Sequence, residues 1–105
     1  MQTEDKKRIA HNRLIARVLE GGGTATPVQR RSAYDSDRLD EPLRTLVNKV
    51  AQYAYSVTDE DIISVKASGL SEDQIFELIV CAALGQSTRQ YESALAALDA
   101  ASEKE

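Results

Sequence analysis

The stretch that decides the fold is YAYSVTDEDIISVKASGLSEDQIFELI, residues 53–79. Thr58 has a side chain that commonly caps the start of a helix, and Asp61 follows at the third helical position, where its carboxylate completes a capping-box-like pair. Ser71 and Gln74 repeat the arrangement as a second capping box. Each cap contributes about 1 kcal/mol. The stretch therefore predicts two helix starts in close succession.

The helix that follows Thr58 is expected to end at Gly69, because a residue without Cβ takes the left-handed conformation at little cost. Val65 and Leu70 are then spaced as the apolar pair of a Schellman-type helix end. Leu70 and Ile75 are also spaced as a hydrophobic staple across the second cap. Connections this short predict sharp reversals of the chain between neighbouring helices.

After the second cap, the run from Ile75 to Leu84 is apolar on nearly every face except at Glu77. Such a run predicts a helix buried on all sides, either in the centre of the protein or between subunits. Gly85 allows a break in this helix or a close crossing. A helical apolar stripe continues from Gln86 through Tyr91, Ala94, Leu95, Leu98 and Ala101.

Before the deciding stretch, three more helical segments are predicted. An amphipathic helix extends from about Glu4 to Glu20 and ends at three consecutive glycines, 21–23. Thr26 followed by proline predicts an N-cap and a short helix toward Ala33, and a polar loop covers 35–40. The third helix is expected to start at Pro42 and to run to about residue 57, with one apolar stripe: Leu43, Leu46, Val47, Val50, Ala51 and Ala54.

The fold class that these patterns predict is all-α. We find no strand pattern, internal repeat or low-complexity block in the 105 residues. Aromatic residues make up only 5% of the chain and Trp is absent, so the core must be built from Leu, Ile, Val and Ala. We therefore expect an orthogonal or antiparallel helical bundle in one domain, small enough that oligomerisation would stabilise it.

Charge is distributed unevenly along the chain, whose net charge is −4. Residues 1–33 hold seven Lys/Arg and three Asp/Glu, giving +4, and residues 34–105 hold six and fourteen, giving −8. A basic first third can indicate a nucleic-acid-binding arm, but here the charges lie on an amphipathic helix without interleaved aromatic residues. A solvated or subunit-facing surface explains them more simply, and nucleic-acid binding is not expected.

Cysteine usage and hydropathy restrict the class of protein further. The single cysteine, Cys81, excludes an intrachain disulfide and a cysteine-rich metal site, and no signal-like segment opens the chain. The longest apolar run is about half of what a bilayer requires. We expect a cytoplasmic protein without a membrane span. Neither a calcium loop, a glycine-rich phosphate loop nor a catalytic triad is present, so no metal or cofactor is implied.

The order of these caps and stripes resembles the carboxymuconolactone decarboxylase and alkylhydroperoxidase D-like (AhpD-like) family. The residues that carry the resemblance are the helix with Ala54 and Val57, the turn ASGLS at 67–71, the start EDQIFE at 72–77 and the small-residue helix after it. The resemblance covers roughly 41–100. It implies an AhpD-like helical core over 41–105, with an added N-terminal helical arm and linker over 1–40. It also implies a homo-oligomer, whether trimer, hexamer or dimer.

In peroxidase members of that family, a Cys-x-x-Cys followed by three residues and a His lies upstream of the Gly-Leu-Ser turn. Counted back from Gly69, these positions are Ala54, Val57 and Asp61 in this chain. Methyl and isopropyl groups provide no nucleophile or resolving thiol. A carboxylate on the first turn of a helix stays ionised. The family's redox chemistry is therefore not expected here.

The candidate pocket consists of Ala54, Val57, Asp61 and Arg89. Asp61 could replace the family's histidine as a pocket carboxylate, although capping already explains it. The guanidinium of Arg89 could bind an anion or pair with Asp61 or Glu60, and a structural ion pair is the simpler interpretation.

The remaining candidates have simpler interpretations as well. Cys81 is expected to be a buried small hydrophobe, and His11 a surface residue. Tyr53, Tyr55 and Tyr91 suit subunit contacts and a small-molecule cavity equally.

The leading functional hypothesis is a non-redox AhpD-like homo-oligomer that binds a small ligand or serves in assembly. A second hypothesis is a cofactor-independent lyase or isomerase, with a small carboxylate held by Arg89 and with Asp61 or a tyrosine as proton carrier. Residual alkylhydroperoxidase-type antioxidant activity is a further alternative. A fourth possibility is that the basic arm docks on an acidic partner.

Overall fold

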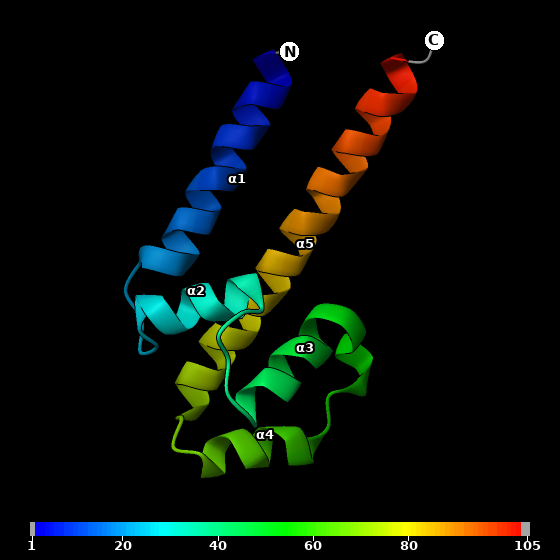
Figure 1. Ribbon diagram of the computed structural model, residues 1–105. Coiled ribbons are helices and arrows are strands. Elements are labelled where there is room, and N and C mark those ends of the chain that lie inside the picture. Colours follow the sequence, from blue (N-terminus) through cyan, green and yellow to red (C-terminus); the bar gives the residue numbers. More distant parts are fainter. Residues whose placement is uncertain (1, 104–105) are drawn as a thin grey trace.

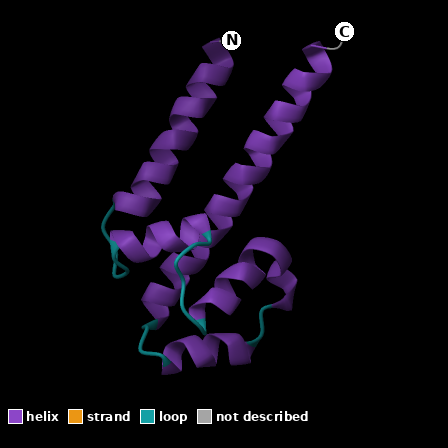
Figure 2. Ribbon diagram, viewed as in Figure 1, coloured by secondary structure: helices purple, strands orange, loops and turns teal. Residues whose placement is uncertain are grey.

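The computed structural model describes the backbone of residues 2–103 and the side chains of residues 6–103, and within that range it contains helices and no strand (Figure 2). The all-α prediction is confirmed. The elements in chain order are α1 (Gln2–Glu20), α2 (Pro27–Asp35), α3 (Leu43–Tyr53), the short 3₁₀ helix η1 (Ala54–Ser56), α4 (Asp59–Ala67) and α5 (Glu72–Glu103).

The predicted caps around α4 are confirmed. The Thr58 hydroxyl accepts from the backbone N–H of Asp61, whose carboxylate accepts in return from the N–H of Thr58 at 2.9 Å. Ser71 and Gln74 exchange the same two bonds before α5, at 3.1 and 2.9 Å. Each of the two capping boxes thus satisfies two backbone N–H groups at the start of a helix.

The glycine at the end of α4 has the predicted conformation. Gly69 has φ +112° and donates its N–H to the carbonyl of Lys66 at 3.0 Å. α2 begins as predicted at Thr26, with Pro27 as its first residue. Its cap also includes Gln29, whose side chain accepts from the Thr26 N–H, a bond that the sequence prediction did not include.

The predicted end of α3 was wrong. α3 was expected to continue to about Val57, but it ends at Tyr53, and the chain tightens into η1. The hydroxyl of Ser56 donates to the carbonyl of Tyr53 at 2.6 Å, and the N–H of Val57 bonds to Ala54 three residues back. Serine side chains compete in this way with the helical backbone pattern, which explains the early end of α3.

α5 is the spine of the molecule (Figure 1). α2 crosses it near the middle, while α3 and α4 pack against its first half. Its second half extends beyond these helices beside α1, so the start of α1 and the end of α5 lie at the same end of an elongated molecule of 54 × 28 × 21 Å.

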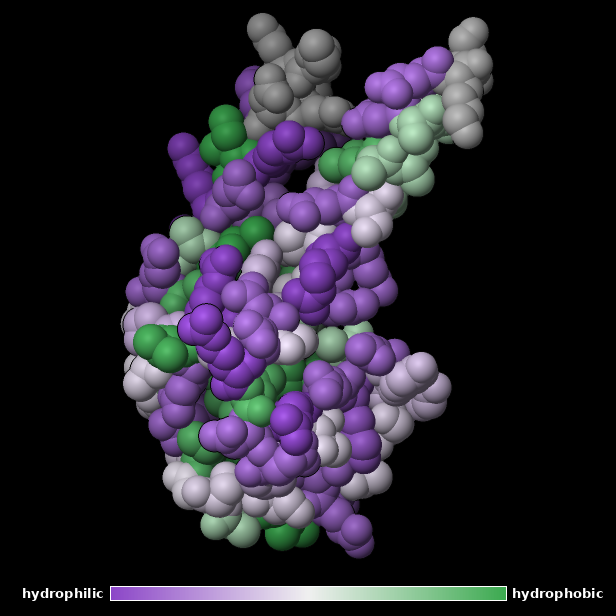
Figure 3. All heavy atoms as spheres, in the orientation of Figure 1, coloured by the Kyte–Doolittle hydropathy of each residue, from purple (hydrophilic) through white to green (hydrophobic). Residues whose placement is uncertain are grey.

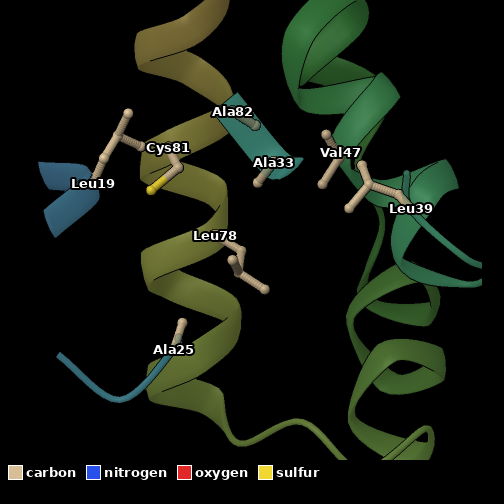
Figure 4. Packing of buried hydrophobic residues seen from close by; sticks show 8 residues of the cluster. All are labelled: Leu19, Ala25, Ala33, Leu39, Val47, Leu78, Cys81 and Ala82. Atoms are coloured by element: carbon tan, nitrogen blue, oxygen red, sulfur yellow. The ribbon is translucent and has the colours of Figure 1, made fainter. Parts of the chain in front are cut away.

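The main hydrophobic core forms where α2, α3 and the first half of α5 meet. Figure 4 shows Leu19 and Cys81 on one side of the cluster and Val47 with Leu39 on the other. Its other buried members are Ala25, Ala33, Leu78 and Ala82. Four of these eight residues come from positions 19–39, which the sequence assigned to an arm and linker, so the core extends across residue 40. A second cluster joins Leu46, Val65 and Ile75.

The first half of α5 is buried on one face only within a single chain. Leu78, Cys81 and Ala82 are buried, but Phe76 and Val80 remain 67% and 37% exposed. The expected burial on all sides is therefore absent from the single chain, because α2, α3 and α4 cover one side of this helix and leave the other open.

Gly85 permits a close crossing and not a break. α5 continues through it, and a Cβ at this position would overlap the carbonyl oxygen of Tyr34 at the end of α2. The backbones of α2 and α5 therefore touch directly, and this contact sets where α2 lies along the spine.

The Gly85→Ala variant tests the crossing. Alanine ordinarily stabilises a helix relative to glycine by roughly 0.5–1 kcal/mol, but here overpacking should cost about 1–3 kcal/mol. We expect a net loss of unfolding free energy in urea titrations. Gly22→Ala is the matched control, because nothing lies within 4 Å of its added Cβ, and it should change stability by less than about 0.5 kcal/mol. Equal midpoints for both variants would contradict the crossing.

Candidate functional site

Asp61 lies half-buried on the first turn of α4, and one of its two carboxylate oxygens, Oδ2, accepts three structural hydrogen bonds. Its Oδ2 accepts from the Lys49 ammonium at 2.8 Å and from the Thr58 hydroxyl at 3.1 Å, in addition to the capping bond. The Lys49 bond is the largest cause that lowers the pKa of Asp61, followed by the backbone bond from Thr58. The carboxylate is therefore ionised at neutral pH and unsuited to carry a proton in a reaction.

The other two positions that the resemblance aligns with redox residues lie in different surroundings. Ala54 is exposed on η1, and Val57 packs half-buried against the second hydrophobic cluster. None of the five principal cavities in the described part of the chain is lined by Ala54, Val57 or Asp61.

Arg89 lies elsewhere in the molecule. Its Nη1 donates to the carbonyl of Tyr34 at 2.8 Å and its Nη2 to the side-chain oxygen of Gln86 at 3.2 Å. The expected pairing with Asp61 or Glu60 is therefore wrong, and Asp61 pairs with Lys49 instead. The guanidinium ties the end of α2 to α5, one turn beyond the Gly85 crossing. The structure does not bring the four candidate pocket residues together.

Cys81 is a buried thiol, as predicted. It is fully buried in the main cluster, and burial is the largest cause that raises its pKa. A thiol that stays protonated and inaccessible is a poor nucleophile toward peroxides.

The prediction of a surface position for His11 was wrong. The residue is half-buried between α1 and α5, with Nε2 3.0 Å from the Thr88 hydroxyl and its ring centroid 6.0 Å from that of Tyr91. The Thr88 hydroxyl also lies 2.8 Å from the carbonyl of Leu84 one turn earlier on α5. The local sequence of α1 gave no signal for this contact, because both partners lie on a distant helix.

Sequence reasoning also missed two charged residues that hold the loop between α1 and α2. Glu77 accepts the backbone N–H groups of Thr24 and Ala25, at 2.6 Å for the latter, and these bonds are the main causes that lower its pKa. Arg30, only 5% exposed, donates through Nη1 to the carbonyls of Val18 and Gly21. The isolated acidic residue in an apolar run was the available signal for Glu77.

Tyr53 and Tyr55 do not build a cavity. Both rings are exposed near η1 and meet edge to face, with centroids 6.2 Å apart.

Over the part of the chain that the structure describes, no group of three or more His, Cys, Asp or Glu side chains is arranged to hold a metal ion. No helix within the same range combines the length and apolar character needed to cross a bilayer, and this includes the 32-residue α5.

No protein-family model matches this chain, and neither a curated protein nor a solved structure is significantly similar to it.

The buried state of Cys81 leads to a direct test of redox chemistry. We expect the purified protein, supplied with dithiothreitol and an organic hydroperoxide, to consume peroxide no faster than its Cys81→Ser variant. Ellman's reagent should label the thiol only when the protein is unfolded by urea. Peroxide consumption that the Cys81→Ser change abolishes would show that the buried thiol is reactive after all.

Proposed function

We propose that this protein is a non-redox, homo-oligomeric helical protein of AhpD-like type, and that its function is assembly. The main observation that supports this proposal is that α1 and the second half of α5 project beyond the packed core. Among the described side chains of α1, none between Lys6 and Val18 is buried, and none of α5 beyond Thr88 is buried. Helices with so little packing gain little tertiary stabilisation, which is the main source of helix stability in proteins.

Apolar side chains are exposed along both projecting helices. Ile9 and Leu14 on α1 are 51% and 48% exposed, and Tyr91 and Leu98 on α5 are 45% and 61% exposed. Figure 3 shows such apolar residues interspersed with hydrophilic ones on both projecting segments. A second packed surface would remove them from water at a gain of about 25 cal/mol per Å² of apolar area.

The seam between α1 and α5 is incompletely filled. Two hollows of about 290 and 320 Å³ flank the His11 contact, and Tyr91 lines both. Both hollows are open to solvent, so side chains of another molecule have room to pack along this seam.

Charge complementarity favours a second copy of this chain as the partner. Residues 6–17 of α1 carry five basic side chains and no acidic one, while residues 90–103 of α5 carry Glu92, Asp99 and Glu103 and no basic one. No ion pair joins the two helices within the described chain. A two-fold dimer can place α1 of one copy along α5 of the other, and both copies then gain the same contacts.

Nothing in the arrangement favours the lyase or isomerase alternative. Its proposed carboxylate anchor, Arg89, is engaged by the Tyr34 carbonyl, and its proposed proton carrier, Asp61, is held by Lys49. The alternative that the basic arm docks on an acidic partner is tested together with assembly below.

Assembly is tested by the mass of the protein in solution. We expect light scattering behind a size-exclusion column to give a multiple of the 11.5 kDa chain. Leu98→Glu should shift the equilibrium toward the monomer. Each copy of Leu98 contributes roughly 1.5–3 kcal/mol when buried, so the dissociation constant of a dimer should rise at least about 100-fold.

Ile63→Glu is the matched control, because Ile63 on α4 is 63% exposed, close to the 61% of Leu98. The Ile63→Glu variant should assemble like the wild type. The circular dichroism spectra of both variants should remain helical. A monomeric wild-type protein, or equal loss of assembly in both variants, would contradict the proposal. A monomer whose α1 binds an acidic polymer would indicate the acidic-partner alternative instead.

A further inference from the structure

A small cavity lies where the end of α1, the following loop and the first turns of α5 meet. Its volume is about 190 Å³. It is lined by two arginines, one carboxylate and three apolar side chains: Arg17, Arg30, Glu77, Val18, Phe76 and Val80. Sites for drug-sized ligands measure roughly 300–1,000 Å³, so an occupant of this cavity is a smaller molecule.

Arg30 gives the cavity a buried cation with unused donor capacity. Its Nη1 donates to two backbone carbonyls, but its Nε is buried and has no hydrogen-bond partner among the described residues. A guanidinium offers five N–H donors, and buried donors in folded proteins rarely lack an acceptor. The positive charge and the unpaired donor both favour an anionic acceptor near Arg30.

Glu77 does not neutralise this cation by direct contact. Its carboxylate accepts from the backbone N–H groups of Thr24 and Ala25 and from the Thr24 hydroxyl, and it makes no ion pair with Arg30 within the described chain. Arg17 adds a second positive charge to the lining, so the cavity keeps a net charge of +1. An anion is attracted to such a site, and a cation is repelled.

The rest of the lining is apolar and partly open to water. Phe76 is 67% exposed and Val80 is 37% exposed, and Val18 is half-buried beside them. A purely inorganic anion would leave these apolar side chains in contact with water. A ligand with a hydrophobic body would cover them and gain from their removal from water.

We propose that this cavity binds a small monocarboxylate with a hydrophobic body, with the carboxylate toward Arg30 and Arg17 and the body against Phe76 and Val80. Arginine suits this role, because its planar donor groups match a carboxylate. The site goes beyond the proposed assembly, since Phe76 and Val80 belong to the first half of α5 and not to the projecting segment.

The test is isothermal titration of the full chain with phenylacetate, using phenylacetamide and acetate as comparisons. We expect saturable binding of one phenylacetate per chain. Phenylacetamide lacks the charge and acetate lacks the ring, so each should bind about tenfold more weakly or worse. Equal affinity for phenylacetate and phenylacetamide, or no saturable binding of phenylacetate, would overturn the proposal.

Variants at exposed positions locate the site without disturbing the fold. Arg17→Gln and Phe76→Ser should each weaken phenylacetate binding about tenfold. Arg31→Gln is the control, because that arginine lies next to Arg30 in sequence but is exposed and pairs with Asp35 outside the cavity. An Arg31→Gln protein that loses as much affinity as Arg17→Gln would contradict this location. The solution mass of each sample gives its oligomeric state, so a loss of phenylacetate binding can be distinguished from a loss of assembly.

Discussion

The close crossing of α2 over α5 at Gly85 is the constraint on which the rest of the structure depends. Because Gly85 has no side chain, the end of α2 rests directly on the spine, and Arg89 fastens it there through the Tyr34 carbonyl. α2 in turn carries Arg30, which binds the carbonyls at the end of α1. The contact between α2 and α5 at Gly85 therefore also determines where α1 lies beside the second half of α5.

This arrangement divides α5 into two parts with different physical requirements. Its first half buries Leu78 and Cys81 in a core that also draws on α2 and α3. Its second half meets α1 around His11 and leaves apolar side chains such as Leu98 in water. The first part can be stable within one chain, while the second gains most from a partner surface. The opposite charges of α1 and of the end of α5 are the reason why we propose a second copy of this chain as that partner.

Local chemistry was predictable from the sequence, and contacts between distant residues were not. Thr58, Ser71 and Gly69 determine their own surroundings through hydrogen bonds within a few residues, so the caps and turns of α4 and α5 could be predicted. The partners of Arg89 and His11 are set by where whole helices pack, and a pattern along one helix does not contain that information. The candidate pocket failed to come together for this reason: Arg89 and Asp61 lie on helices whose relative placement the sequence left open.

Amide hydrogen exchange measured at low and high protein concentration tests the central claim most directly. If α1 and the end of α5 are stabilised by a second copy, residues 6–17 and 90–103 should exchange more slowly as concentration rises, while residues 75–88 in the core should exchange at an unchanged rate. Exchange in all three segments that is independent of concentration would contradict assembly through the projecting helices.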